Sequence, residues 1–260
     1  MLTIRLLPSS FASDGSASKM QHFSCYVVNG SVAFDAGSLA SGVNEHEREA
    51  IRDVVLTHAH LDHIAGLPLF IDDLFPVLTE PVRVHATKEV IEVLETHIFN
   101  WQVYPRFSEL QNEFGPVIQY YQFPNDDQFE IRGLRITAMP VNHKVPSNGF
   151  LIQTDSAKVV FTGDTAESAD LWNAINKSGP IDALLIECAF PNEFEDLASI
   201  SHHLTPRKLG SELKKITADI GAIYVTNLKP AYRDVILDQL KSIVDDRLRV
   251  LDVGREYRFG

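Results

Sequence analysis

Four side chains that can bind a metal ion lie close together in Thr57-His58-Ala59-His60-Leu61-Asp62-His63. Two imidazoles two residues apart can face one ion from a turn, and the carboxylate and imidazole that follow can face a second ion. Imidazole and carboxylate ligands suit zinc, manganese or iron. The segment follows a strand-like run, Asp53–Thr57, and precedes the apolar stretch Ile64–Ile71. We therefore interpret it as the centre of a metal site rather than as an exposed polar loop.

Two further candidate ligands follow later strands. His143 lies in Val141-Asn142-His143-Lys144, after a strand that is expected to end at Met139. Asp164 ends the run Phe161-Thr162-Gly163-Asp164, where a carboxylate can bridge two ions. Each has an ordinary alternative: a solvated loop histidine at position 143, and a helix N-cap at position 164 that is compatible with ligation. The upstream cluster favours the metal interpretation for His143.

Short apolar runs rich in β-branched residues predict strands, and segments with helical periodicity predict helices. The predicted strands are Leu2–Leu7, Ser24–Val28, Val32–Asp35, Asp53–Thr57, Val82–His85, Leu134–Met139, Phe150–Gln153, Val159–Thr162, Ala183–Glu187 and Ala222–Thr226. The predicted helices are Lys88–Phe99, Ala166–Asn176, Thr205–Ile216 and Tyr232–Val244. Strands come first, and strands alternating with helices follow, an order that suits packed sheets with helices outside.

Several of these strands end in polar residues. They are Asp35, Thr57-His58, Asp164, Glu187 and Asn227. A rigid strand followed by a short loop places such groups firmly at one edge of a sheet, and binding and catalytic groups favour loops that a scaffold holds.

The composition is that of a globular protein. The chain has 260 residues, of which 45% are hydrophobic, and we expect residues 1–260 to form one domain with a substantial core. No apolar run reaches the roughly 18 residues that cross a bilayer, so no membrane association is expected. Met1–Leu7 is too short for a signal peptide and is interpreted as a strand. Cys25 and Cys188 suit a reducing cytoplasm and are interpreted as buried apolar residues.

The charge balance limits the class of substrate. Acidic residues outnumber basic ones by 35 to 23, which gives a net charge of −12. Such a surface repels polyanions at long range, and no block of lysine and arginine suggests a track for nucleic acid. A local basic patch stays an open alternative, so the net charge disfavours long RNA or DNA in particular. A small anionic substrate could still be held by the metals.

The candidate residues occur in the order Asp35, His58, His60, Asp62, His63, His143 and Asp164. This order resembles the metallo-β-lactamase superfamily, and the resemblance covers nearly the whole chain. It implies an α/β fold, the αββα sandwich, with a dinuclear metal centre between the sheet edges. The implied ligands are His58, His60 and His143 for the first ion, Asp62 and His63 for the second, and Asp164 as a bridge. Asp35 would orient a histidine ligand, and a turn-forming aspartate before Gly37 is the alternative.

Three later segments are Glu187-Cys188-Ala189-Phe190-Pro191-Asn192, His202-His203-Leu204-Thr205-Pro206 and Val225-Thr226-Asn227-Leu228-Lys229-Pro230. They resemble the class II 3′,5′-cyclic-nucleotide phosphodiesterases, whose layout the tRNA 3′-processing endonucleases share. In that layout a glutamate pairs with a histidine that contacts phosphate or protonates the leaving oxygen. His203 matches the histidine best, because it directly precedes Leu-Thr-Pro, and Glu187 would be its partner. A capping histidine and a strand-end carboxylate are the alternatives.

One position departs from that pattern. Related enzymes carry a histidine ligand where this chain has Asn227. An amide oxygen can bind a hard or borderline cation, but less strongly than imidazole. The second ion could therefore be bound more weakly, be a different metal, or be absent. We keep Asn227 as a candidate ligand, with a turn residue before Lys229-Pro230 as the alternative.

The resemblance implies a metal-dependent phosphodiesterase that hydrolyses cyclic AMP or cyclic GMP to the 5′-nucleotide. Two divalent ions, expected to be zinc with manganese or iron as alternatives, would generate a metal-bound hydroxide that attacks phosphorus. Asp62 could accept the proton of the nucleophile, and His203, polarised by Glu187, would donate one to the leaving 3′ oxygen.

Two alternative hypotheses stay open. One is another hydrolase on the same fold, either an RNA 3′-end endonuclease or an enzyme that cleaves lactones or esters. The other is a nucleotide-binding protein that kept the scaffold and lost turnover. The expected partner is a small anionic molecule and not a long nucleic acid. A homodimer is suggested by the fold alone, and a cytoplasmic location by the cysteine usage.

Overall fold

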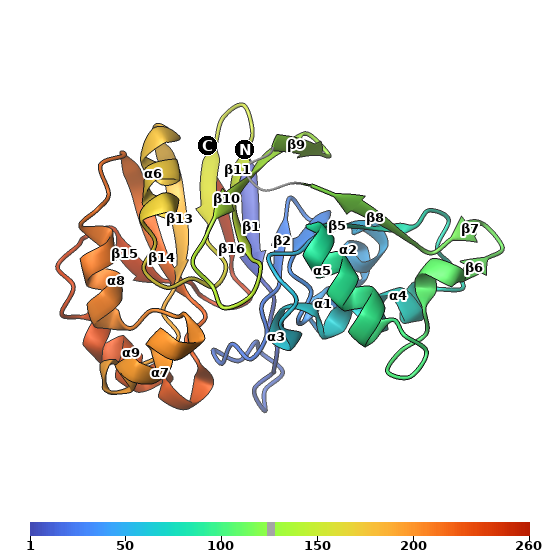
Figure 1. The fold of residues 1–260 in the computed structure, drawn as a ribbon, viewed down its shortest axis with the longest axis horizontal. Coiled ribbons are helices and arrows are strands. Elements are labelled where there is room, and N and C mark those ends of the chain that lie inside the picture. Colours follow the sequence, from blue (N-terminus) through green and yellow to red (C-terminus); the bar gives the residue numbers. More distant parts are fainter. Residues whose placement is uncertain (124–127) are drawn as a thin grey trace.

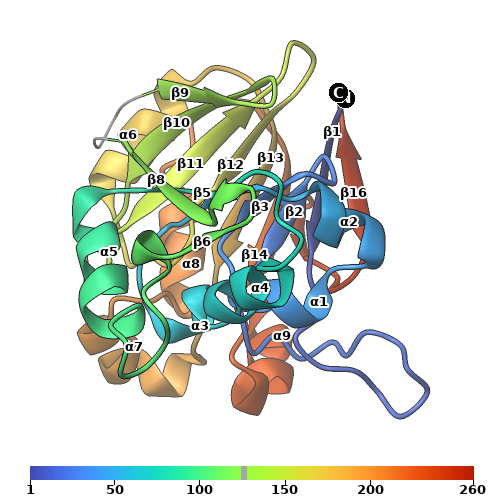
Figure 2. The ribbon, with the colours of Figure 1, turned by 90° about the vertical axis from the view of Figure 1, so that its right-hand side faces the viewer.

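The computed structural model describes residues 1–123 and 128–260. In this part of the chain, two seven-stranded β-sheets lie face to face, and helices cover their outer faces (Figure 1). Figure 2 looks from the side on which α4 and α5 lie, so that the two sheets stand one behind the other. This is the αββα sandwich that the resemblance to the metallo-β-lactamase superfamily implies.

The first sheet contains mainly the N-terminal strands. Its order is β16 (Glu256–Phe259), β1 (Leu2–Leu6), β2 (Tyr26–Val28), β3 (Val32–Phe34), β4 (Asp53–Val55), β5 (Val82–Ala86) and β8 (Ile118–Gln122). The helices on this side are α1 (Leu39–Gly42), α2 (Glu45–Ala50), α3 (Leu61–Ile64), α4 (Gly66–Leu74) and α5 (Lys88–Val93), which continues as a π-helical turn, Leu94–Ile98. Phe70 of α4 and Val90 of α5 pack with Val54 and Val84 of the sheet in one core cluster.

The second sheet contains the C-terminal strands. Its order is β15 (Leu248–Val250), β14 (Ile220–Thr226), β13 (Ile181–Glu187), β12 (Lys158–Phe161), β11 (Asn148–Gln153), β10 (Leu134–Pro140) and β9 (Gln128–Ile131). The helices on this side are α6 (Ala169–Lys177), α7 (Glu195–Ser201), α8 (Pro206–Leu213) and α9 (Arg233–Leu240). Trp172 of α6, Leu209 of α8 and Ile236 of α9 share a core cluster with Leu184 and Val225 of the sheet.

Short elements complete the described structure. They are the small hairpin β6 (Gln111–Asn112) and β7 (Gly115–Pro116) and the 3₁₀ turns Phe107–Glu109, Asn192–Phe194 and Pro230–Tyr232. None of the helices in residues 1–123 and 128–260 has the length and apolar character that a membrane crossing requires.

Aromatic side chains fill the space between the sheets. Phe34 of the first sheet contacts Phe150 of the second edge to face, with ring centroids 5.6 Å apart, and Tyr26 lies 4.6 Å from Phe161. All four residues belong to one buried cluster. Such contacts fix the two sheets relative to each other, and with them the loops at their edges.

The predicted elements are present, and their ends differ in ways that local chemistry explains. Each predicted strand is found with ends shifted by at most two residues, and each predicted helix is found. The third helix has the predicted cap: Pro206 occupies its first turn and Thr205 Oγ1 accepts a hydrogen bond from Lys208 N. The second helix begins at Ala169 rather than Ala166, because Ser168 provides the cap by accepting from Leu171 N. Both cysteines are buried and unpaired.

Candidate metal centre

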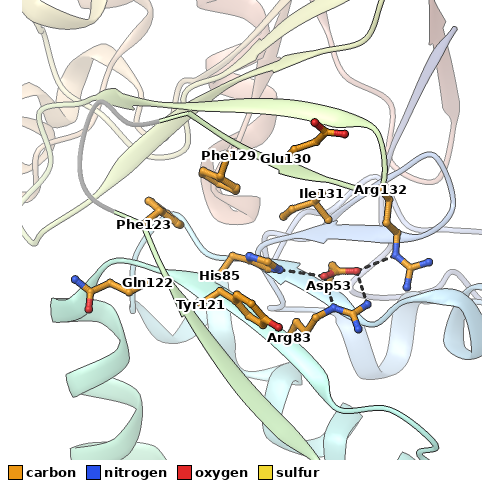
Figure 3. Close-up of a pocket in the computed structure, with 10 residues that line it drawn as sticks. All are labelled: Asp53, Arg83, His85, Tyr121, Gln122, Phe123, Phe129, Glu130, Ile131 and Arg132. Carbon is orange, nitrogen blue, oxygen red and sulfur yellow. Dashed lines mark hydrogen bonds and ion pairs between the residues drawn. The ribbon is translucent and has the colours of Figure 1, made fainter.

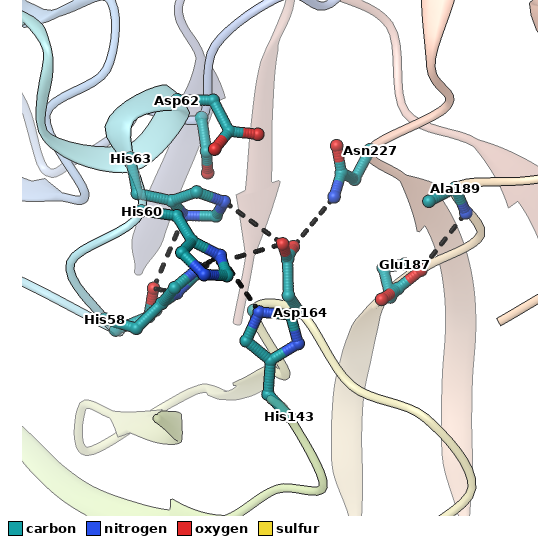
Figure 4. A network of polar contacts seen from close by, with 12 residues as sticks. His58, His60, Asp62, His63, His143, Asp164, Glu187, Ala189 and Asn227 are labelled. Carbon is teal, nitrogen blue, oxygen red and sulfur yellow. Dashed lines mark hydrogen bonds and ion pairs between the residues drawn. The ribbon is translucent and has the colours of Figure 1, made fainter. Parts of the chain in front are cut away.

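The directions of the strands bring the predicted site residues to one edge of the sandwich (Figure 4). β12, β13 and β14 run parallel, so Asp164 after β12, Glu187 at the end of β13 and Asn227 after β14 emerge at the same edge. β10 reaches the same edge because antiparallel β11 lies between it and β12, and His143 follows β10. From the first sheet, β4 leads to His58.

Three imidazoles and one carboxylate converge at this edge. The ligand atoms of His58, His60, His143 and Asp164 all lie within 4.8 Å of one another. The closest approaches are His58 Nε2 to His60 Nδ1 at 3.0 Å and His143 Nε2 to His60 Nδ1 at 3.1 Å. Asp164 Oδ2 lies 3.9 Å from His58 Nε2.

The protonation of these rings suits cation binding. Burial lowers the pKa of His58 well below its ordinary value, lowers that of His60, and lowers that of His143 to about 4. The rings are therefore neutral at neutral pH. His143 Nδ1 lies 3.1 Å from the carbonyl oxygen of His202, which can only accept a hydrogen bond. The proton of His143 is thus on Nδ1, and the lone pair of Nε2 faces the cluster.

A second set of donors surrounds His63. Its Nδ1 lies 2.7 Å from Asp35 Oδ2, so Nδ1 carries the proton and donates it to the carboxylate. Its Nε2 is buried without a hydrogen-bond partner among the described residues and lies 3.3 Å from Asp164 Oδ2. Burial by itself would lower the pKa of His63, but the carboxylates of Asp164 and Asp35 raise it well above its ordinary value. This negative environment favours a positive charge at His63, whether a proton or a metal cation supplies it.

Asn227 and Asp62 lie at the same edge with other partners. Asn227 donates from Nδ2 to Asp164 Oδ1 at 2.7 Å, so its amide nitrogen rather than its oxygen faces the carboxylate. Asp62 Oδ2 accepts from Lys229 Nζ at 3.2 Å. No role for Lys229 is predicted from the sequence, although its place two residues after Asn227 puts it at the same strand end.

Glu187 and His203 form a buried pair beside the cluster. His203 Nδ1 lies 2.6 Å from Glu187 Oε1, and His203 Nε2 lies 4.0 Å from Asp164 Oδ2. Glu187 also accepts hydrogen bonds from the backbone N–H groups of Thr165, Ala189 and Leu204. Burial by itself would lower the pKa of His203, but the charge and hydrogen bond of Glu187 raise it above its ordinary value. The pair can therefore hold a proton next to the histidine cluster.

The donor set fits a divalent cation of borderline softness. Neutral imidazole nitrogens and a carboxylate oxygen converge, and the nitrogen of His63 that faces Asp164 is buried without a hydrogen bond. Zinc in proteins is held by such nitrogen and oxygen ligands, commonly with further groups that orient the histidines. The assignment of individual residues to each ion stays a prediction.

A match to a protein family shows which superfamily the chain belongs to. The model of the family described as the beta-lactamase superfamily domain matches residues 27–222. The chain belongs to this superfamily. The match includes the histidine segment, His143, Asp164 and Glu187, and it ends before Asn227.

Several curated proteins are relatives of this superfamily member. It is 26% identical to a probable 3′,5′-cyclic-nucleotide phosphodiesterase of Yersinia pestis, over 81% of this chain and 66% of that protein. It is 25% identical to a 3′,5′-cyclic-nucleotide phosphodiesterase of Schizosaccharomyces pombe, over 98% of this chain and 81% of that protein. A nuclear ribonuclease Z of Triticum aestivum is 28% identical over 49% of this chain and 70% of that protein. The chain thus spans 66% of the Yersinia pestis protein, and it spans 53% of a 3′,5′-cyclic-nucleotide phosphodiesterase of Aliivibrio fischeri.

Solved structures confirm the metallo-β-lactamase fold. Unliganded yeast PDE1 aligns with a TM-score of 0.77 at 15% identity, over 98% of each chain. The metallo-β-lactamase fold protein YhfI from Bacillus subtilis aligns with a TM-score of 0.75 at 18% identity, over 99% of this chain and all of that one. The predicted resemblance to this superfamily and to its cyclic-nucleotide phosphodiesterases is thus confirmed, and the superfamily member is related to both phosphodiesterases and ribonucleases.

One pocket of this superfamily member adjoins the centre, and a larger one lies elsewhere. The adjoining pocket, about 250 Å³, is apolar and is lined by Ala59, His60, Glu89, Val90, Val93, Val145 and Pro146. The larger pocket, about 420 Å³, includes Asp53, Arg83, His85 and Arg132 (Figure 3). Asp53 begins β4, whereas His58 follows the opposite end of that strand, so this pocket is not part of the metal centre.

Proposed function

We propose that this superfamily member is a metal-dependent phosphodiesterase that hydrolyses 3′,5′-cyclic nucleotides, cyclic AMP or cyclic GMP, to 5′-nucleotides. The observation that carries the proposal is the position of His203, whose Nε2 lies 4.0 Å from Asp164 Oδ2 while its Nδ1 contacts Glu187. Phosphodiester hydrolysis needs charge stabilisation at the phosphate oxygens and a proton for the departing alkoxide. The histidine cluster suits the first need, and the adjacent His203–Glu187 pair suits the second.

The chain's ligands would hold two divalent cations. They are His58, His60 and His143 for the first, Asp62 and His63 for the second, Asp164 between the two, and Asn227 if its amide turns. We expect zinc, with manganese and iron as alternatives. When bound, such cations neutralise charge on phosphate oxygens and make water acidic enough to act as a nucleophile near neutral pH. Asp62, at the edge of the cluster, would accept the proton that the attacking water loses.

His203 would supply the proton for the departing 3′ oxygen. Glu187 accepts from Nδ1 and is itself held by three backbone N–H groups, so the imidazole has one defined orientation. The other ring nitrogen, Nε2, faces the cluster where the phosphate would bind. The raised pKa of His203 allows the ring to be protonated close to neutral pH and to donate from Nε2.

The apolar pocket beside His60 would receive the base of the nucleotide. His60 is both a wall of this pocket and a member of the cluster, so a phosphate at the cluster places the rest of a small substrate at the pocket mouth. Its aliphatic walls, Val93 and Val145 among them, suit a planar heterocycle, and Glu89 offers an acceptor for a base N–H.

One assay distinguishes the candidate functions. Purified protein loaded with zinc or manganese is incubated with cyclic AMP, cyclic GMP, bis(p-nitrophenyl) phosphate, precursor tRNA and a lactone. We expect conversion of the cyclic nucleotide to the 5′-nucleotide. His58→Ala or chelation should lower the rate about 100-fold or more. The matched control is His46→Ala, an exposed histidine on α2. Full activity after removal of all metal would contradict the proposal.

A second candidate is an RNA 3′-end endonuclease. The relationship to the ribonuclease Z of Triticum aestivum supports it, and the net charge of −12 opposes it because long RNA would be repelled. Cleavage of precursor tRNA without hydrolysis of cyclic nucleotides would favour this candidate. Cleavage of the lactone alone would favour an ester or lactone hydrolase. Tight nucleotide binding without hydrolysis under any divalent metal would favour a binding protein.

A further inference from the structure

We propose that the two cation sites of this centre are unequal, and that the ammonium of Lys229 competes with the second cation. The site of His58, His60 and His143 would hold its ion tightly. The site of Asp62 and His63 would bind a second ion weakly. This inference rests on the metal centre of the proposed function, but it concerns affinity and stoichiometry rather than substrate.

Lys229 already neutralises one ligand of the second site. Its Nζ lies 3.2 Å from Asp62 Oδ2, and the two side chains are 32% and 30% exposed. The backbone near Lys229 is fixed, because Lys229 N donates to the carbonyl of Ala189 and Tyr232 N donates to the carbonyl of Lys229. The ammonium is therefore presented to Asp62 by a defined turn and not by a free loop.

Asn227 forms a hydrogen bond with Asp164, a second candidate ligand of the same site. Its Nδ2 donates to Asp164 Oδ1 at 2.7 Å, and its own N–H donates to Gln21 Oε1 at 2.9 Å. Its φ of 53° is in the left-handed region, which asparagine adopts more readily than most residues. An ionised carboxylate only accepts hydrogen bonds, so Asp164 selects the amide orientation that presents N–H rather than the metal-binding oxygen.

The competition follows from these two contacts. A cation that enters between Asp62 and His63 must displace the ammonium of Lys229 or remain close to its positive charge. It also has to share Asp164 with the amide of Asn227. No lysine or arginine among the described residues forms a hydrogen bond with the first three histidines, although the Glu187-paired ring of His203 lies 5.1 Å from that of His143. Nδ1 of His143 is held by the carbonyl of His202, so its Nε2 faces the cluster. The charge of Lys229 offsets part of the negative charge around His63, and an amide at position 227 is a weaker ligand than imidazole. We infer that these two features weaken the second site relative to the first.

An ordinary surface ion pair is the competing interpretation of Lys229. Partly exposed pairs stabilise proteins by about 0–1 kcal/mol and need no further role. The two interpretations differ in the metal content they predict. Lys229→Met keeps most of the aliphatic side chain and removes only the charge. Asn227→His supplies an imidazole in place of the amide.

The test measures metal content directly. Wild type, Lys229→Met, Asn227→His and the control Lys241→Met are saturated with zinc and transferred to zinc-free buffer. Lys241 pairs with Asp238 at 3.0 Å on the surface, and this pair includes none of the candidate ligands. Retained zinc is measured by mass spectrometry, and the affinity for further zinc by calorimetry. Circular dichroism confirms that each variant is folded.

We expect wild type and Lys241→Met to retain about one zinc ion per chain, and the other two variants to retain about two. The affinity of the second site should rise about tenfold or more in Lys229→Met. Two retained ions in wild type, or an unchanged second-site affinity in Lys229→Met, would overturn the inference. The outcome is independent of the substrate assay: a protein that does not hydrolyse cyclic nucleotides can still show this pattern, and an active one can fail to show it.

Discussion

Asp35 and His63 are 28 positions apart in the sequence, yet His63 Nδ1 lies 2.7 Å from Asp35 Oδ2 in the interior of the protein. Asp35 is fully buried and also accepts hydrogen bonds from the N–H and the hydroxyl of Thr57. These contacts fix the carboxylate, and the carboxylate fixes the tautomer of His63, so that Nε2 faces Asp164. Asp35 thus contacts His63 as the role implied by the resemblance requires. That it acts on a metal through His63 stays a prediction.

Substitution of Asp35 by asparagine should weaken metal binding. The amide can turn its N–H₂ toward His63 Nδ1 and favour the wrong tautomer. We expect zinc affinity to fall about 10- to 100-fold, and the free energy of unfolding of the metal-free protein to fall by about 1–3 kcal/mol. Calorimetric zinc titration and urea unfolding measure the two effects. Asp155→Asn, at a side chain that is 96% exposed, is the control. Unchanged zinc affinity in Asp35→Asn would show that Asp35 only supports the fold.

Loss of the proton donor should depend on the leaving group. His203→Gln should slow hydrolysis of cyclic AMP about 10²- to 10⁴-fold, because the departing alkoxide needs a proton. The same variant should hardly slow bis(p-nitrophenyl) phosphate, since nitrophenolate departs without protonation. Glu187→Gln should show the same selectivity with a smaller loss. The measurement is kcat on both substrates. Equal losses on both substrates would instead indicate that His203 binds phosphate.

Filling the apolar pocket should affect the nucleotide more than the phosphodiester bond. Val93→Trp, on the pocket wall formed by α5, should raise KM for cyclic AMP about tenfold by excluding the base. Methyl p-nitrophenyl phosphate has no base, and its kcat/KM should stay within about twofold. Val235→Trp, at a 47% exposed position of α9, controls for the added aromatic ring. A parallel loss on both substrates would place the base elsewhere.

Much of this candidate centre could be predicted because its candidate ligands follow strands. The segment from His58 to His63 is compact in sequence, and Asp164 and Glu187 each follow a clearly apolar run. Parallel strands then bring the last two to one edge, which is a consequence of topology and not of local sequence. What the structure adds to these predictions is mainly the distances between the residues, such as that between His203 and Asp164.

Other features depend on contacts between distant residues and could not be predicted. The orientation of the Asn227 amide is set by Asp164, 63 positions earlier. Lys229 forms an ion pair with Asp62, 167 positions earlier. The helix Gly66–Leu74 was not predicted, since Pro68 and a nearly continuous apolar sequence obscure its periodicity. Proline is tolerated in the first turn, where no intrahelical N–H bond is lost. The edge strand Ile118–Gln122 was also missed, because its mixed polar sequence pairs only through β5.

The carboxylate of Asp53, which lies outside the metal centre among the contacts drawn in Figure 3, should make the stability of the protein depend on pH in acid. Asp53 is 3% exposed and accepts hydrogen bonds from Arg83, Arg132 and His85. Burial by itself would raise the pKa of Asp53, but these hydrogen bonds and the charge of Arg83 lower it well below its ordinary value. Because the folded-state pKa lies below the unfolded value of about 3.9, the ionised form stabilises the fold above that pH, and this contribution is lost as the pH falls below it.

Asp53→Asn isolates this contribution. At pH 7 we expect the variant to be less stable than wild type by about 3 kcal/mol, because Arg83 and Arg132 lose their buried counterion. The difference between the two proteins should stay constant from pH 7 to about pH 5 and shrink as the pH falls below about 4. Urea unfolding of the metal-free proteins at each pH measures it. Comparing the two proteins cancels the titration of shared groups that lie outside the Asp53 network. A difference that stayed constant down to pH 3 would show that the Asp53 carboxylate does not have the lowered pKa on which this prediction depends.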